Sequence, residues 1–245
     1  MEILLDTTAQ IERIFKRKRK LEIEHIISEN DCGSSTFVLG EYKSNMVKDF
    51  ITLYNIMQIE DTVAGVRENI NDTVFNRSFE RVYYVFNDLC KTYNEDYALI
   101  REELRTYAKR LEVRFKYGLK SDLFNETDCH RAKAEIVYQE SSAGIPGISC
   151  TKLDDFCKSC EFIAKHIEII KELKEKPTIQ EKMKKAMDKI IINEYDLKGN
   201  TCRSLGDCII SLEALKTSEK KICTTNIDDF RPICDHIGVD LCEMT

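Results

Sequence analysis

The sequence contains few of the residues that make tight turns and no tryptophan. Its 245 residues include three prolines and nine glycines. Because tight turns depend on these two residue types, their scarcity excludes most all-β architectures and predicts long helices. Hydrophobic residues make up 42% of the chain, which is too large a share for a disordered protein. Since a domain has about 150 residues, we expect one large domain or one domain with a big insert.

Long apolar segments are also missing, and so is a recognisable secretory signal. The first residues, MEILLD, lack the basic and apolar regions of a signal peptide. No apolar run approaches the roughly 18 residues that a membrane span requires. The 11 cysteines are odd in number and belong to a chain too long for a small disulfide-stapled domain. We therefore expect a cytoplasmic protein with reduced thiols and no membrane contact.

Basic residues are slightly outnumbered by acidic ones. Lysine and arginine total 37 against 43 aspartates and glutamates, which gives a formal net charge of −6. Binding along a phosphate backbone requires concentrated positive charge, so this balance excludes a protein that coats nucleic acid over its whole surface. A local basic face remains compatible with it.

The first part of the chain alternates between strand and helix patterns. Residues 2–6 form an apolar run that predicts a buried strand ending at Asp6, and a helical pattern follows it. Residues 35–39 predict a second buried strand, and apolar residues at helical spacing begin after Glu41. This alternation is typical of an α/β fold with a parallel sheet.

The same alternation returns near the C-terminus. Residues 220–225 and 237–242 predict strands, the segment IDDFRP after Asn226 predicts a loop, and a compact apolar helix follows Asp207. These two ends together have the size of one ordinary α/β domain. Helical patterns without a convincing strand fill residues 59–125 between them.

We therefore expect a discontinuous α/β domain with a helical insertion. The domain comprises residues 1–57 and 179–245, and the mostly helical insert comprises residues 58–178. A cysteine-rich element at residues 129–160 belongs to the insert.

Acidic residues follow the predicted strands at the edge where parallel sheets bind ligands. Asp6 ends the first strand, Glu41 follows the second, Asp207 opens a helix, and Asp228 and Asp229 follow the strand that ends at residue 225. Carboxylates that crowd together raise each other's pKa unless a cation compensates them. Carboxylate oxygens suit Mg²⁺ and Mn²⁺, and one or two such ions are a standard means of cleaving phosphodiesters.

Four segments resemble, in order, those of the PIN-domain nucleases, in particular the bacterial toxin type. They are ILLDTT, FVLGEY, LGDCIISLEAL and ICTTNIDDF. The resemblance covers both ends of the chain and implies a three-layer α/β/α sandwich with a central parallel sheet. It also implies Mg²⁺ or Mn²⁺, single-stranded RNA as substrate, a role in toxin–antitoxin or defence systems and a neutralising protein partner. The long helical insert is a departure from the compact toxins.

The resemblance also implies particular site residues. Asp6, Glu41, Asp207 and Asp229 fall on the catalytic acidic positions, and the aspartates among them would hold the metal. Asp228 competes with Asp229 for the last position.

Further residues are expected to bind the substrate. The resemblance makes Asn226, which stands where other members carry an acid, a probable site residue, and Thr7 lies beside Asp6. Arg101, Arg105 and Lys109 are four residues apart, so they form a ridge on a helix that also carries aromatic side chains. Such a ridge suits an RNA backbone, with an aromatic ring stacked on a base.

The basic segments have a simpler interpretation as well. The run KRKRK at residues 16–20 could line the same crevice as the acids. A solvated helix face remains the alternative for this run and for the basic ridge.

One group of cysteines has a spacing compatible with zinc. Cys150, Cys157 and Cys160 lie close in sequence, and Cys129 or His130 could complete a tetrahedral Zn²⁺ site. Buried reduced thiols are the alternative interpretation.

The sequence thus predicts a metal-dependent nuclease, specifically an endoribonuclease that cleaves single-stranded RNA by two-metal-type hydrolysis. The alternative is a degenerate PIN-like module that binds RNA or a protein partner without cutting. The insert could also serve as a homodimerisation or sensor unit. In the simplest interpretation, Asp6 and Asp207 only cap helices.

Overall fold

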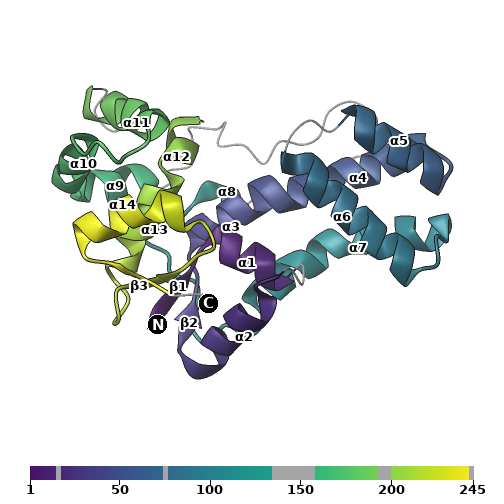
Figure 1. Ribbon diagram of the computed structural model, residues 1–245, viewed down its shortest axis with the longest axis horizontal. Coiled ribbons are helices and arrows are strands. Elements are labelled where there is room, and N and C mark those ends of the chain that lie inside the picture. The colour runs from purple at the N-terminus through teal and green to yellow at the C-terminus, as the bar shows by residue number, and fades with distance from the viewer. Residues whose placement is uncertain (15–17, 74–76, 134–157, 193–199, 243–245) are drawn as a thin grey trace. The chain divides into compact units, whose positions relative to one another are not determined.

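The computed structural model describes residues 1–14, 18–73, 77–133, 158–192 and 200–242 (Figure 1). The chain divides into two compact units. The first unit comprises the described residues of Met1–Tyr42, Tyr117–Ala134 and Ser149–Thr245, and the second those of Lys43–Lys116 and Glu135–Ile148. Compared with the expected domain bounds, residues 43–57 belong to the helical second unit, and residues 117–133 and 158–178 belong to the first unit.

The first unit contains a four-stranded parallel sheet. Its strands are β1 (Ile3–Leu5), β2 (Cys32–Gly33), β3 (Lys221–Cys223) and β4 (Asp240–Leu241), in the spatial order β2-β1-β3-β4. All three neighbouring pairs are parallel, so the predicted α/β class with a parallel sheet is confirmed. The chain moves from β1 to one side and returns on the other, which places a topological switch point between β1 and β3. Ligands of such sheets bind beyond the C-terminal strand ends at this point.

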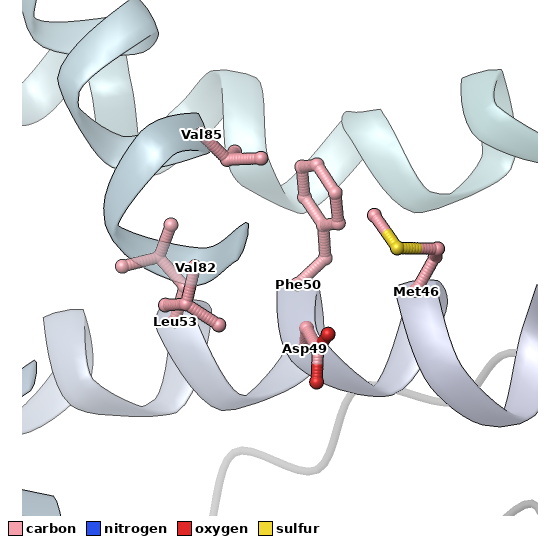
Figure 2. A pocket seen from close by; sticks show the side chains of 6 residues that line it. All are labelled: Met46, Asp49, Phe50, Leu53, Val82 and Val85. Atoms are coloured by element: carbon pink, nitrogen blue, oxygen red, sulfur yellow. The ribbon is translucent and has the colours of Figure 1, made fainter. Parts of the chain in front are cut away.

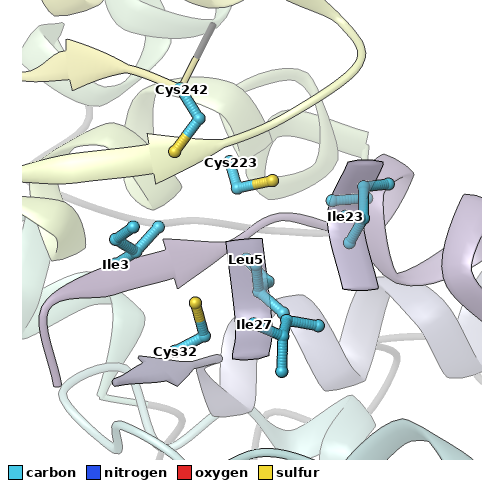
Figure 3. Packing of buried hydrophobic residues seen from close by; sticks show 8 residues of the cluster. Ile3, Leu5, Ile23, Ile27, Cys32, Cys223 and Cys242 are labelled. Atoms are coloured by element: carbon cyan, nitrogen blue, oxygen red, sulfur yellow. The ribbon is translucent and has the colours of Figure 1, made fainter. Parts of the chain in front are cut away.

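The sheet is centred on β1, a short apolar strand that is buried on both faces. Ile3, Leu4 and Leu5 of β1 are almost completely inaccessible, as expected of a central parallel strand. Side chains from the sheet and from two neighbouring helices pack into one cluster (Figure 3). Its members are Ile3, Leu5, Ala9, Ile23, Ile27, Cys32, Cys223 and Cys242. Three thiols thus contribute to the interior of the sheet, as reduced cysteines commonly do.

Helices connect these strands. The early ones are α1 (Thr7–Ile14), α2 (Lys20–Glu29), α3 (Thr36–Tyr42) and α8 (His130–Lys133). The later ones are α9 (Ser159–Lys165), α10 (Ile167–Lys174), α11 (Glu181–Ile192), α12 (Asn200–Ser204), α13 (Gly206–Ala214) and α14 (Ile227–Ile237).

Two sequence predictions within the first unit are wrong. Residues 36–39 form the start of helix α3 and not a strand, because the Ser35 hydroxyl accepts a hydrogen bond from the Val38 backbone N–H at 3.1 Å and initiates the helix. The expected loop after Asn226 is instead the beginning of α14. Two aspartates in the first turn favour that helix electrostatically, and Gly238 ends it in a left-handed conformation (φ 70°).

Between Lys43 and Lys116, the described part of the second unit consists of helices joined by short turns. It consists of a π-helical segment η1 (Lys43–Val47), α4 (Lys48–Ile59), α5 (Val63–Thr73), α6 (Arg77–Thr92) and α7 (Tyr97–Lys116). The helical patterns of this region are therefore confirmed. Figure 2 shows a small pocket lined by Met46, Asp49, Phe50, Leu53, Val82 and Val85. A lining with a single polar side chain offers little to orient a ligand.

Across the described segments, no helix combines the length and the apolar character needed to cross a membrane.

Candidate active site

Asp6 follows β1 directly and is fixed by hydrogen bonds at the C-terminal edge of the sheet. Its side chain is buried, with a residue exposure of 1%. Its Oδ2 accepts hydrogen bonds from the hydroxyls of Thr224 at 2.8 Å and Thr8 at 3.0 Å. Its Oδ1 accepts the backbone N–H of Ala9 at 2.7 Å, so Asp6 also caps α1, as the simplest interpretation predicted. Burial outweighs these bonds and raises the pKa of Asp6 to about 6.

Glu41 reaches the same region from α3. Its Oε2 accepts a hydrogen bond from the Thr7 hydroxyl at 2.9 Å, so Thr7 holds this carboxylate. Its Oε1 lies so close to Gly206 that any side chain at position 206 would collide with it. Burial raises the pKa of Glu41, while the positive charges of Arg131 and Arg203 oppose that rise. The absence of a side chain at Gly206 therefore lets α13 approach the carboxylate closely.

Asp207 links the acidic residues into one neighbourhood. It lies in the first turn of α13, and its pKa is raised to about 7. Burial is the largest cause, followed by the negative charges of Glu41, Asp6 and Asp229, while Lys182 lowers the pKa. Asp6, Glu41 and Asp229 therefore all act on Asp207 although they come from distant segments of the chain, and these four acids are named here the carboxylate site.

The fourth acid, Asp229, is held by two side-chain amides. Its Oδ2 accepts a hydrogen bond from Nδ2 of Asn226 at 2.8 Å, and its Oδ1 accepts one from Nε2 of Gln180. Asp228, its neighbour on α14, is exposed, and its charge is not among those that raise the pKa of Asp207. The structure thus brings Asp229 and Asn226 into the carboxylate site and leaves Asp228 at the surface.

The donor chemistry of the carboxylate site suits a hard divalent cation, but its side chains do not form a ready coordination sphere. All four acids offer oxygen ligands, which Mg²⁺ and Mn²⁺ prefer. Within the described part of the chain, however, no group of three or more His, Cys, Asp or Glu side chains is close enough to hold an ion. The acids share an electrostatic neighbourhood, and coordination would require their side chains to draw together.

Sequence analysis missed Glu213 of α13, an acid that is completely buried. Its Oε1 accepts a hydrogen bond from the Thr127 hydroxyl at 3.2 Å, and among the described residues its Oε2 has no hydrogen-bond partner. Burial raises the pKa of Glu213 to about 8, and the charge of Glu41 adds to this shift. The signal was present in the sequence, because Glu213 is the only charged residue in the apolar segment CIISLEAL.

Other residues of the site were missed as well. Thr8 and Thr224 hold Asp6, and both belong to Thr-Thr pairs inside the segments that resemble the nuclease family. Arg131 is buried, with its guanidinium 5.1 Å from the centre of the Phe37 ring. No local pattern distinguishes Arg131 in the sequence, because its role depends on the packing of α8 against α3.

The basic residues expected to bind RNA along α7 belong to the second unit, whereas the carboxylate site belongs to the first. Arg101 donates a hydrogen bond to Gln58, and Arg105 lies 3.8 Å from the carboxylate of Glu102. The side chain of Lys109 is outside the described part of the structure.

The basic run at residues 16–20 is described only from residue 18 onward and lies in the first unit. Its last two members form ion pairs, Arg19 with Glu22 at 3.9 Å and Lys20 with Glu24 at 3.2 Å. These contacts agree with a solvated helix face.

The zinc hypothesis stays a prediction. Cys150 and Cys157 lie outside the described residues, while Cys129 is buried and Cys160 is half-buried.

Comparison with known proteins does not assign the chain to a family: no family model, curated protein or solved structure matches it significantly.

Proposed function

We propose that this protein is a nuclease that depends on Mg²⁺ or Mn²⁺ and cleaves single-stranded RNA internally. The observation that supports this most is the raised pKa of Asp207, which three other carboxylates increase. Negative charge concentrated in this way favours a divalent cation. The location of the carboxylate site also agrees with the proposal, because Asp6 follows β1 at the switch point of a parallel sheet. A PIN-like three-layer α/β/α arrangement of the first unit is part of the same proposal.

Each residue of the site has a proposed role. Asp6, Asp207 and Asp229 bind the cation directly or through water, and Glu41 completes the cluster or orients the attacking water. Asn226 holds the carboxylate of Asp229, and Thr7 holds that of Glu41, instead of contacting the substrate directly. When bound, the cation activates water and stabilises the leaving oxygen of the phosphodiester.

One observation favours a second candidate function, a module that binds RNA or a protein partner without cutting. In the described residues, no three potential ligands are positioned to hold an ion. If the side chains cannot draw together, the fold would keep the binding surface of a nuclease without its chemistry.

A cleavage assay separates the two candidates. The full chain is incubated with a labelled single-stranded RNA and either Mg²⁺ or Mn²⁺, alongside Asp6→Asn and the control Asp235→Asn. Asp235 is an exposed acid on α14, the helix that also carries Asp229. We expect cleavage by the wild type and by Asp235→Asn and none by Asp6→Asn. Equal cleavage by all three proteins, or none by the wild type with either metal, would contradict the proposal.

A further inference from the structure

The geometry points to a binding track for the phosphate backbone of a single-stranded nucleic acid, formed by Lys182, Lys185 and Lys189 of α11 and by Arg203 of α12. The track leads to the carboxylate site. This inference deepens the proposed function and rests on it, and it assigns substrate contacts to a surface other than the basic ridge of α7.

The lysines of the track share one side of α11. At about 100° per residue, Lys182, Lys185 and Lys189 fall within an arc of about 60° around the helix axis. Glu181 and Asp188 border this arc, about 40° and 60° from Lys185 around the helix axis. Asp188 is bound by Lys174 of α10 at 2.6 Å. One of the two bordering acids is therefore already paired with a cation of a neighbouring helix.

The cations of the track are exposed and available. Lys182, Lys185, Lys189 and Arg203 all lie at the surface. In the described part of the chain they make no side-chain hydrogen bond or ion pair. Lysines on α10 differ, since Lys171 is bound by Glu168 at 2.7 Å. Unpaired charges can engage a ligand without first breaking an internal contact.

One end of the track meets the carboxylate site. Gln180, directly before α11, donates a hydrogen bond to Asp229. The positive charge of Lys182, in the first turn of α11, lowers the pKa of Asp207. The positive charge of Arg203 lowers the pKa of Glu41. Helix α12, which carries Arg203, packs against both α11 and α13. From Lys182, Lys185 and Lys189 lie about 4.5 Å and 10.5 Å further along the axis of α11.

This arrangement fits a phosphate backbone better than a membrane surface. The lysines of the track are about 4.5 Å and 6 Å apart along the helix axis, so they can contact successive or alternate phosphates of a single strand, whose phosphates are spaced about 3.4 Å apart when the bases are stacked. A helix that binds membranes must insert its apolar face into the lipid. The apolar face of α11 is already buried within the first unit through Met183, Ala186, Met187 and Ile190.

The test measures binding without cleavage. Fluorescence anisotropy follows a labelled 15-nucleotide single-stranded RNA in EDTA, with the full-length wild type and with Lys185→Gln/Lys189→Gln. Losing two phosphate contacts should weaken binding about 25-fold at 0.1 M salt and reduce the slope of log K against log salt by about 1.4. Since no metal is present, this result does not depend on whether the carboxylate site is catalytic.

A matched variant controls for the change in net charge. Lys91→Gln/Lys216→Gln also removes two exposed lysines, one from α6 and one that lies before β3, near the N-terminal edge of the sheet. Neither forms an ion pair with any residue that the structure describes. It should bind RNA as the wild type does. Equal weakening by both double variants, no weakening by either, or no RNA binding by the wild type would overturn the inference. So would tight binding to vesicles containing phosphatidylserine that is lost on Lys185→Gln/Lys189→Gln while RNA binding is not.

Discussion

The acids of the carboxylate site and the charged residues of α7 experience opposite environments. In the first unit, Asp6 is 1% exposed and Asp207 is surrounded by other acids that raise its pKa. On α7 of the second unit, the side chains of Arg105 and Glu102 are 65% and 67% exposed and lie beside each other as an ion pair. Burying like charges costs stability, whereas exposed pairs cost and contribute little. The like charges around Asp207 therefore carry a cost in stability that a bound cation would compensate.

The largest expected effect is on catalysis. Asp207→Asn should reduce kcat/KM for single-stranded RNA about 100-fold or more, since even residues that only support metal ligands contribute 10–100-fold. Asp88→Asn, which alters an exposed acid of the second unit, should leave the rate unchanged. A similar loss in both variants would remove the distinction between the two units.

The next effect concerns stability and its dependence on pH. Glu213 has a pKa of about 8 in the folded chain against a usual value of 4.5, so the folded state holds its proton more tightly than the unfolded state. Its ionisation therefore lowers the free energy of unfolding progressively between about pH 4.5 and pH 8. Glu213→Gln cannot ionise and should gain a few kcal/mol over the wild type at pH 8.5, but little at pH 4.5. Urea unfolding at both values checks this, and a pH-independent difference would contradict it.

A smaller effect is expected from the hydroxyl that holds Asp6. Thr224→Val removes the hydrogen bond to Oδ2 of Asp6 and leaves a buried acceptor short of a donor. In Thr224→Val, the free energy of unfolding should fall by about 1–3 kcal/mol. Thr224→Ser retains the hydroxyl and should lose much less. Thermal unfolding at neutral pH compares the two, and equal losses would mean that packing of the methyl group, and not the hydroxyl, stabilises this corner.

The smallest effect is expected on α7. Arg105→Gln breaks the exposed ion pair with Glu102 and should change the free energy of unfolding by less than about 0.5 kcal/mol. A loss of more than 1 kcal/mol in urea unfolding, a bound set by the usual range for exposed pairs, would show that this surface is more tightly organised than its exposure indicates.

The sequence predicted the sheet more reliably than its details. The apolar run at β1 and the segment at β3 were recognisable because short buried strands of parallel sheets are continuously apolar. The same property misled the prediction at residues 35–39, since a short apolar run fits a buried helix equally well and the Ser35 cap decided the outcome.

The site was predictable where chemistry follows a strand end and not where it depends on packing. Asp6 and Asp207 could be proposed from their positions, and the structure brings them together with Glu41 and Asp229. The roles of Arg131 and Gln180 could not, because they arise from contacts between segments that are distant in sequence.

Binding of Mn²⁺ to the full chain is the most direct test of the carboxylate site. At pH 8, above the pKa values of about 6 for Asp6 and about 7 for Asp207, both acids are ionised and able to bind the ion. Electron paramagnetic resonance should show the signal of free Mn²⁺ disappearing as one or two ions bind to each wild-type chain. The affinity of Asp207→Asn for Mn²⁺ should be weaker by about 10-fold or more. A wild-type chain that binds Mn²⁺ no better than Asp207→Asn would contradict the convergence of these four acids on a metal.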